Sequence, residues 1–162
     1  MILIIDFGSQ YNQLIARRVR EHHVYCQIEP PDISIAAIKA LNPEGIILSG
    51  GPASIYSQGA PRVNKGIFNL GIPVLGICYG LQYMVDSLGG KVIGSKKREY
   101  GFAELLVKQQ KDLFKGVNKK TQCWMSHGDS IGSLPAGFVI TASTANTPVA
   151  AAQNSKRGFY GL

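Results

Sequence analysis

One cysteine lies between two glycines at the point where an apolar segment is followed by an amphipathic one. Residues 73–82 read PVLGICYGLQ, with Cys78 near the centre. Residues 74–77 have strand character, whereas residues 80–88 carry apolar side chains at the spacing of one helix face. A strand, a turn that holds one nucleophilic side chain and a helix together form a nucleophile elbow. This pattern predicts an α/β fold with Cys78 on the turn.

Such a turn favours acyl transfer by the thiol. Its strained backbone holds the side chain out of the sheet, and the N-terminus of the following helix favours thiolate over thiol. The alternative is a buried core thiol, because free cysteine is among the most buried residue types. A second glycine pair, Gly50 and Gly51 at the end of the apolar segment 46–48, favours the catalytic interpretation. Backbone N–H groups of glycines are unobstructed, so two such strand ends side by side suit an oxyanion hole.

Strand-like and helix-like segments alternate through the first 90 residues. This alternation predicts an α/β fold of three layers, a mostly parallel, flavodoxin-like open sheet with helices on both faces. Ligands of such sheets bind beyond the carboxyl ends of the strands, where both glycine-rich turns fall. The expected strands are 2–6, 24–28, 45–48 and 74–77, and the expected helices are 10–21, 33–41, 63–70 and 80–88.

Shorter, strand-like segments follow residue 90 and predict an added antiparallel region. The expected strands there are 91–93, 102–107, 123–126, 138–142, 149–153 and 159–162.

Length and composition predict one globular domain, since 162 residues with 45% hydrophobic content can form a core. No apolar run approaches the roughly 20 residues that span a bilayer, and the first residues lack the features of a signal peptide. Three cysteines without paired spacing favour a reducing compartment, so we expect a cytoplasmic location and no membrane partner. Cys26 and Cys123 are interpreted as core residues, and no metal site is predicted.

The net charge of +7 leaves two interpretations, a nucleic-acid surface or a set of solvated and docking faces. Aromatic side chains do not alternate with the cations, as a strand-binding groove would require, so we expect no nucleic acid partner. The cations cluster at Arg17, Arg18 and Arg20, at Lys96, Lys97 and Arg98, and at Lys119 and Lys120.

Six short segments carry a resemblance to the class I, or triad, glutamine amidotransferases, and more narrowly to the glutaminase half of the GMP synthase family. In chain order they are DFGSQY (6–11), ARRVRE (16–21), SGGP (49–52), GICYGLQ (76–82), REYG (98–101) and WMSHGD (124–129). The resemblance covers the whole chain. It implies that residues 1–162 hydrolyse glutamine and supply ammonia for the ATP-dependent amination of XMP to GMP in guanine nucleotide biosynthesis.

The resemblance also implies a role for each matching residue. Cys78 would attack the side-chain carboxamide of glutamine and form a thioester, while the N–H groups of Gly51 and Tyr79 bind the oxyanion. The positions that would bind the amino and carboxylate groups of glutamine are Gln82, Ser126, His127, Gly128 and Asp129. Within this group, His127 is interpreted as acting through its position and not as the base.

One element of the family pattern is missing from the sequence. In the family, the strand that corresponds to 159–161 leads into a His-Pro-Glu motif, whose histidine is the general base. The chain stops at Leu162, and His22, His23 and His127 lie in other contexts. We therefore expect a domain truncated before its His-x-Glu motif. ATP pyrophosphatase and dimerisation domains would follow in the same protein or a partner subunit, use ATP and Mg²⁺, and form a homodimer.

The chain itself is not expected to bind a nucleotide or to need a cofactor. Residues 49–54, SGGPAS, superficially resemble the ATP pyrophosphatase loop, but Ala53 stands where that loop has aspartate, and no P-loop is present. Three alternatives to the glutaminase remain: a regulatory glutamine-binding relative, an inactive fragment and a hydrolase of another amide. Gln82 and residues 126–129 favour an amino-acid substrate.

We expect a polypeptide of residues 1–162 to release ammonia from glutamine slowly, because loss of a general base typically costs about 10²–10⁴ in rate. The measurement is steady-state ammonia release, compared with a longer polypeptide that includes a His-x-Glu motif. Equal rates for the two polypeptides would contradict the assignment of the missing base.

Overall fold

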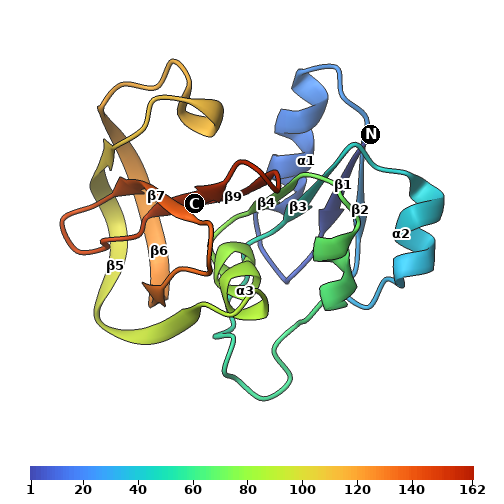
Figure 1. Ribbon diagram of the computed structural model, residues 1–162, viewed down its shortest axis with the longest axis horizontal. Helices are drawn as coiled ribbons and strands as arrows, with labels where there is room; N and C mark the ends of the chain where they lie inside the picture. The colour runs from blue at the N-terminus through green and yellow to red at the C-terminus, as the bar shows by residue number, and fades with distance from the viewer.

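A nine-stranded sheet organises the chain in a computed structural model, which describes side chains at residues 1–94, 101–125 and 128–162 and the backbone alone elsewhere. Figure 1 shows the sheet running across the molecule. The strand order is β2-β1-β3-β4-β9-β8-β7-β5-β6. The strands are β1 (Ile2–Ile5), β2 (Cys26–Glu29), β3 (Gly45–Leu48), β4 (Val74–Gly76), β5 (Lys91–Val107), β6 (Lys120–Ser133), β7 (Val139–Ser143), β8 (Ala151–Asn154) and β9 (Phe159–Gly161).

The sheet has a parallel and an antiparallel part. Strands β1 to β4 pair in parallel, and β9 joins β4 in parallel as well. On its other edge β9 pairs antiparallel with β8, and antiparallel pairing continues through β7, β5 and β6. The predicted mostly parallel α/β sheet with an antiparallel extension is therefore confirmed.

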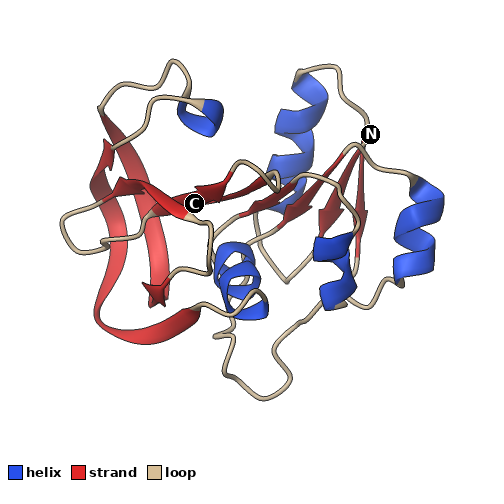
Figure 2. Ribbon diagram, viewed as in Figure 1, coloured by secondary structure: helices blue, strands red, loops and turns tan.

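Helices cover the two faces of the parallel part. They are α1 (Asn12–Glu21), α2 (Ile35–Leu41) and α3 (Tyr79–Ser87), with the 3₁₀ helix η1 (Lys65–Asn69). The other 3₁₀ helix, η2 (Asp112–Phe114), packs on the antiparallel part through Phe114. Alternate residues of β1 point to opposite faces: Leu3 packs in the core with α2, η1 and α3, whereas Ile4 packs with Ala16 of α1. Figure 2 shows α1 on one side of the strands and α3 on the other. Among the described residues, no helix is long and apolar enough to cross a bilayer.

Two helix predictions were wrong in detail. The segment 63–70 forms the 3₁₀ helix η1 and not an α-helix. The Asn64 side chain accepts the Gly66 N–H and begins the helix, while Gly71 adopts a positive φ just after it, so only a short helix fits between them. The first helix begins at Asn12 and not at residue 10, because the preceding residues form a turn in which the Ser9 hydroxyl accepts the Tyr11 N–H.

In the second half of the chain, the observed strands differ more from the expected ones. The expected segments 91–93 and 102–107 are parts of one strand, β5, and the segment 123–126 is the centre of a longer strand, β6. The long strands pair with each other over most of their length. Local pattern could not predict this, since glycine and polar residues interrupt the apolar alternation.

The first turn of α3 packs directly on β3. A Cβ atom at Gly80 would lie under 3.0 Å from the Leu48 carbonyl oxygen, a separation that real Cβ atoms do not adopt. We expect Gly80→Ala to lower the free energy of unfolding by about 1–3 kcal/mol, because the helix has to move away from the strand. Equilibrium urea unfolding measures the change.

Gly94→Ala is the matched control for this prediction. A Cβ atom at Gly94 meets nothing within 4 Å, and its φ lies outside the positive region. Its free energy of unfolding should change by less than about 0.5 kcal/mol. Equal losses in the two variants would show that close packing of α3 on β3 is not the cause.

Candidate active site

Cys78 occupies the turn between β4 and α3, as the sequence predicted. Its backbone has φ 48° and ψ −108°, a conformation that a non-glycine residue adopts only when its surroundings hold it. The Cys78 N–H donates to the Leu162 carbonyl at 2.7 Å, and the preceding Ile77 N–H donates to the Leu48 carbonyl at 2.9 Å. Bonds to β3 and to the end of β9 therefore hold the nucleophile elbow from both sides.

The glycine pair after β3 lies beside the elbow. A Cβ atom at Gly50 would be 3.7 Å from the Cys78 Cβ, so the two turns are in contact. A Cβ atom at Gly51 would lie under 3.0 Å from the Phe7 carbonyl oxygen, so this position admits only glycine without movement of the backbone. The predicted proximity of the two turns is confirmed.

The two predicted oxyanion donors flank this contact. Tyr79 is the first residue of α3, and the first N–H groups of a helix have no acceptor within the helix. Gly51 follows β3, the strand next to β4. The arrangement offers N–H groups from two adjacent strand ends near one thiol, as an oxyanion hole requires. The roles of Gly51 and Tyr79 remain predictions.

Desolvation governs the ionisation of the nucleophile. Cys78 keeps an exposed surface, but burial among its neighbours raises the pKa of its thiol above the ordinary value. Burial disfavours the charged thiolate, and this effect is opposite to the one expected from the helix N-terminus. The sequence pattern pointed to the helix N-terminus alone and did not predict this opposing effect of burial.

A cavity of about 140 Å³ opens beside Cys78. Gln82, one helical turn after the thiol, and Asp129 of β6 both line it. The buried Gln82 side-chain amide donates to the Asp129 backbone carbonyl at 3.1 Å, which ties α3 to the antiparallel part of the sheet. Two predicted substrate-binding residues are thus brought to the nucleophile. Gly128 precedes Asp129 in the chain, whereas the side chains of Ser126 and His127 lie outside the described residues.

The rest of the cavity wall is mostly apolar and was not predicted. Leu105 contributes from β5, Phe114 from η2 and Val149 from the loop before β8, and Leu162 directly follows β9. In the sequence these side chains look like ordinary core residues. Only the strand order, which places β9 next to β4 and β8 next to β9, brings them near Cys78.

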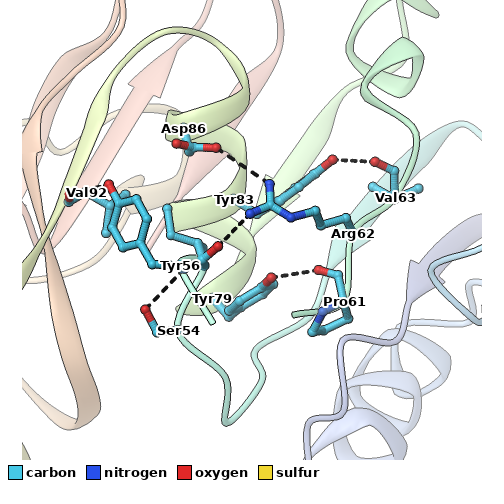
Figure 3. Close-up of polar contacts among 10 residues, drawn as sticks. Ser54, Tyr56, Pro61, Arg62, Val63, Tyr79, Tyr83, Asp86 and Val92 are labelled. Atoms are coloured by element: carbon cyan, nitrogen blue, oxygen red, sulfur yellow. Dashed lines mark hydrogen bonds and ion pairs between the residues drawn. The ribbon is translucent and has the colours of Figure 1, made fainter. Parts of the chain in front are cut away.

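Tyrosine hydroxyls attach the loop after β3 to the helix of the elbow. Tyr79 donates to the Pro61 carbonyl at 2.6 Å, and Tyr83, one turn later, donates to the Val63 carbonyl. Arg62, between these two acceptors, donates to the Ile55 carbonyl at 2.6 Å. Figure 3 shows both tyrosines of α3 directed at this loop. Burial raises the pKa of both phenols, so they stay neutral donors, and the loop that carries the glycine pair is held against α3.

The other cysteines have different environments. Cys26 is buried and its thiol donates to the Ala16 carbonyl, so the core interpretation is confirmed for this residue. Cys123 is half-buried and lines the cavity, so the core interpretation was wrong for Cys123. Within the described ranges, no group of three His, Cys, Asp or Glu residues could hold a metal ion.

The basic residues of α1 form a solvated face. Arg17 and Arg18 both pair with Glu21, at 3.0 and 2.8 Å, and remain largely exposed. Lys120 of β6 pairs with Glu104 of β5 at 3.4 Å. This agrees with the interpretation of the charge as solvated faces. The side chains of Lys96, Lys97 and Arg98 lie outside the described residues.

Comparison with known proteins gives consistent matches. Residues 3–162 match the family described as Glutamine amidotransferase class-I. GMP synthase [glutamine-hydrolyzing] of Heliobacterium modesticaldum is 55% identical over 161 residues, and that of Azoarcus sp. is 53% identical over 169 residues. Each alignment covers 99% of this chain but only 31% and 32% of the relative, so the chain spans about a third of the length of these curated relatives.

Solved structures share the fold. A Thermoplasma acidophilum protein assigned provisionally to a GMP synthase has a TM-score of 0.88 and 29% identity, over 99% of this chain and 81% of its own. A glutamine amidotransferase from Thermotoga maritima has a TM-score of 0.80 over 99% of this chain and 73% of its own, and at 19% identity it supports the fold alone.

We expect iodoacetamide to alkylate Cys78 of the 162-residue chain slowly at neutral pH, because only the thiolate reacts and burial raises the pKa of the thiol. The rate should rise with pH, with a midpoint above the value of about 8.5 for a free cysteine. Mass-spectrometric mapping of the alkylated residue across pH values makes the measurement, and a model thiol peptide is the control. A midpoint below that of the peptide would contradict the inference that burial raises the pKa of the Cys78 thiol.

Proposed function

The chain belongs to the class I glutamine amidotransferase family, and from that premise we propose that it is the glutaminase part of a glutamine-hydrolysing GMP synthase. The observation that carries the proposal is the position of Cys78. It lies on a strained elbow, beside a glycine strand end, and lines a cavity together with Gln82 and Asp129. These are the groups that the hydrolysis of an amino-acid amide needs.

The proposed reaction begins at the sulfur of Cys78. A base takes the thiol proton, the sulfur bonds to the carboxamide carbon of glutamine, and the N–H groups of Gly51 and Tyr79 hold the oxyanion. The C–N bond then breaks, the nitrogen takes up a proton and leaves as ammonia, and a glutamyl thioester remains. Water next adds to the acyl carbon and returns a proton to the sulfur, which releases glutamate and restores the thiol.

Binding of the substrate ends is assigned to α3 and β6. Gln82 and Asp129 are joined by a hydrogen bond, so one helix and one strand present a fixed polar edge to the cavity. On this proposal, Gly128, Ser126 and His127 complete that edge, with His127 in a positional role. The apolar wall opposite excludes water from the thioester region.

We propose that the general base and its orienting carboxylate come from outside residues 1–162. His22 and His23 follow α1 and lead into β2, which places them at the amino edge of the parallel strands. Cys78 lies at the carboxyl edge, after β4. Leu162, in contrast, is hydrogen-bonded to the Cys78 N–H, so a segment joined to it begins beside the thiol. This supports a His-x-Glu segment that follows β9.

The rest of the proposal rests on the family resemblance of the sequence and on the greater length of the GMP synthase relatives. On this proposal, a synthetase part with an ATP pyrophosphatase and a dimerisation domain uses ATP and Mg²⁺ to aminate XMP with the ammonia released here. It belongs to the same protein or a partner subunit, and the complete enzyme is a cytoplasmic homodimer. For residues 1–162 alone, the alternative is glutamine binding with little turnover.

A glutamine-shaped chloroketone tests the proposed function. In the protein expressed from its complete reading frame, we expect one adduct on Cys78, prevented by excess glutamine, because the cavity would bind the reagent next to the thiol. Intact mass and peptide mapping make the measurement. Cys26 and Cys123 serve as internal controls, and Cys78→Ala should remove both the adduct and ammonia release. Labelling of Cys78 no faster than Cys123, without protection by glutamine, would contradict the proposal.

A further inference from the structure

A buried serine hydroxyl joins the two strand ends beside the nucleophile. Ser49 is 0% exposed and precedes the glycine pair after β3. Its Oγ accepts the Phe7 N–H at 2.9 Å, and its hydroxyl donates to the Gly50 carbonyl at 2.8 Å. Both the donor and the acceptor function of the side chain are therefore used, and both partners are backbone groups.

The hydrogen bond to the Gly50 carbonyl acts on the peptide unit between Gly50 and Gly51. The Gly50 carbonyl and the Gly51 N–H belong to the same trans peptide, so they point in opposite directions. Ser49 holds this carbonyl through a hydroxyl that also accepts the N–H of Phe7, two residues after β1. Because β3 lies between β1 and β4, an oxygen held on the β1 side directs the N–H toward the β4 side, where Cys78 follows.

Among the residues whose side chains the structure describes, few other contacts fix the plane of this peptide. The Ser49 N–H donates to the Ile5 carbonyl at 3.1 Å, which holds the backbone before the pair. The Gly51 Cα is confined by its close approach to the Phe7 carbonyl. Between these points two glycines follow each other, and glycine permits backbone rotations that other residues resist. The hydrogen bond from the Ser49 hydroxyl to the Gly50 carbonyl restricts rotation of the Gly50–Gly51 peptide, which packing alone does not fix.

We infer that Ser49 is a positioning residue, whose hydroxyl orients the Gly50–Gly51 peptide so that the Gly51 N–H faces the oxyanion formed at Cys78. The inference rests on the proposed glutaminase function, because it assigns how one donor of that oxyanion hole is aligned. Ser49 touches neither the substrate nor the sulfur in this role. Its effect passes through a peptide bond.

The test uses Ser49→Ala in the protein expressed from its complete reading frame. We expect kcat for glutamine hydrolysis to fall about 10-fold to 100-fold, because misalignment should cost less than the 10²–10³ that follows loss of an oxyanion donor. KM should change less than about threefold, since the ground-state amide depends less on the oxyanion hole than the transition state does.

Two compounds that react with Cys78 distinguish misalignment of the Gly51 N–H from general damage to the site. The γ-aldehyde analogue of glutamine forms a tetrahedral adduct whose oxygen occupies the oxyanion position, so its affinity should fall in parallel with kcat. Alkylation of Cys78 by iodoacetamide forms no oxyanion, so its rate should change less than about twofold. A merely structural role of Ser49 would not produce this difference between the two ligands.

Ser34→Ala is the matched control. Ser34 is exposed, and its hydroxyl accepts the Ala37 N–H at 3.1 Å at the start of α2. This variant also loses a serine hydroxyl bound to a backbone N–H, so its melting temperature should fall while kcat stays unchanged. If Ser49→Ala does not fold, Ser49→Cys replaces it, because a thiol is a weaker donor and should lower kcat about tenfold.

The outcomes are distinct. An active wild-type protein with unchanged kcat in folded Ser49→Ala, or in Ser49→Cys where that variant replaces it, would overturn the inference and leave the proposed function intact. Parallel losses in kcat and in iodoacetamide alkylation would also overturn it, since they indicate damage to the nucleophile. A wild-type protein that neither hydrolyses glutamine nor binds the aldehyde would overturn the proposed function, and the inference with it.

Discussion

The close contact between Gly80 of α3 and the Leu48 carbonyl of β3 is the constraint on which the rest of the site depends. A side chain at residue 80 would push the helix away from the sheet. Gly76 meets a similar limit, because a Cβ atom there would lie under 3.0 Å from the Leu81 backbone nitrogen. Because Gly76 and Gly80 have no side chains, α3 can begin close to the ends of β3 and β4. Cys78 is held in its strained conformation by this close packing together with the backbone hydrogen bonds to Leu48 and Leu162.

A second constraint is the change of strand direction at β9. This strand is parallel to β4 on one side and antiparallel to β8 on the other, so it joins the two parts of the sheet (Figure 1). The cavity lies where the two parts meet, with the thiol from the parallel part and Asp129 from the antiparallel part. The hydrogen bond from the Gln82 side chain to the Asp129 carbonyl links α3 to β6 across this boundary. The nucleophile and the proposed substrate groups therefore depend on contacts that are distant in the chain.

Features that depend on neighbouring residues were predictable from the sequence, as was the meeting of the two glycine-rich turns at one edge of a parallel sheet, whereas most other contacts between distant segments were not. The turn at Cys78 and the strand β3 were predicted because glycine spacing and apolar runs act locally. The union of two expected strands into β5 depends on pairing with β6. Likewise, Phe114 lines the cavity only through the strand order, and the direction of the Cys78 pKa comes from desolvation by residues throughout the site.

The proposed catalysis needs two separate contributions, stabilisation of the oxyanion and removal of the thiol proton. In the proposed reaction, residues 1–162 contribute backbone N–H groups that would bind the developing oxyanion, and such groups need no reorganisation during the reaction. They do not favour formation of the thiolate, because burial raises the pKa of Cys78. On the proposed mechanism, activity therefore depends on when a base reaches the thiol. Burial works against the thiolate, so on the proposed mechanism the segment that supplies the base makes a contribution separate from that of the elbow.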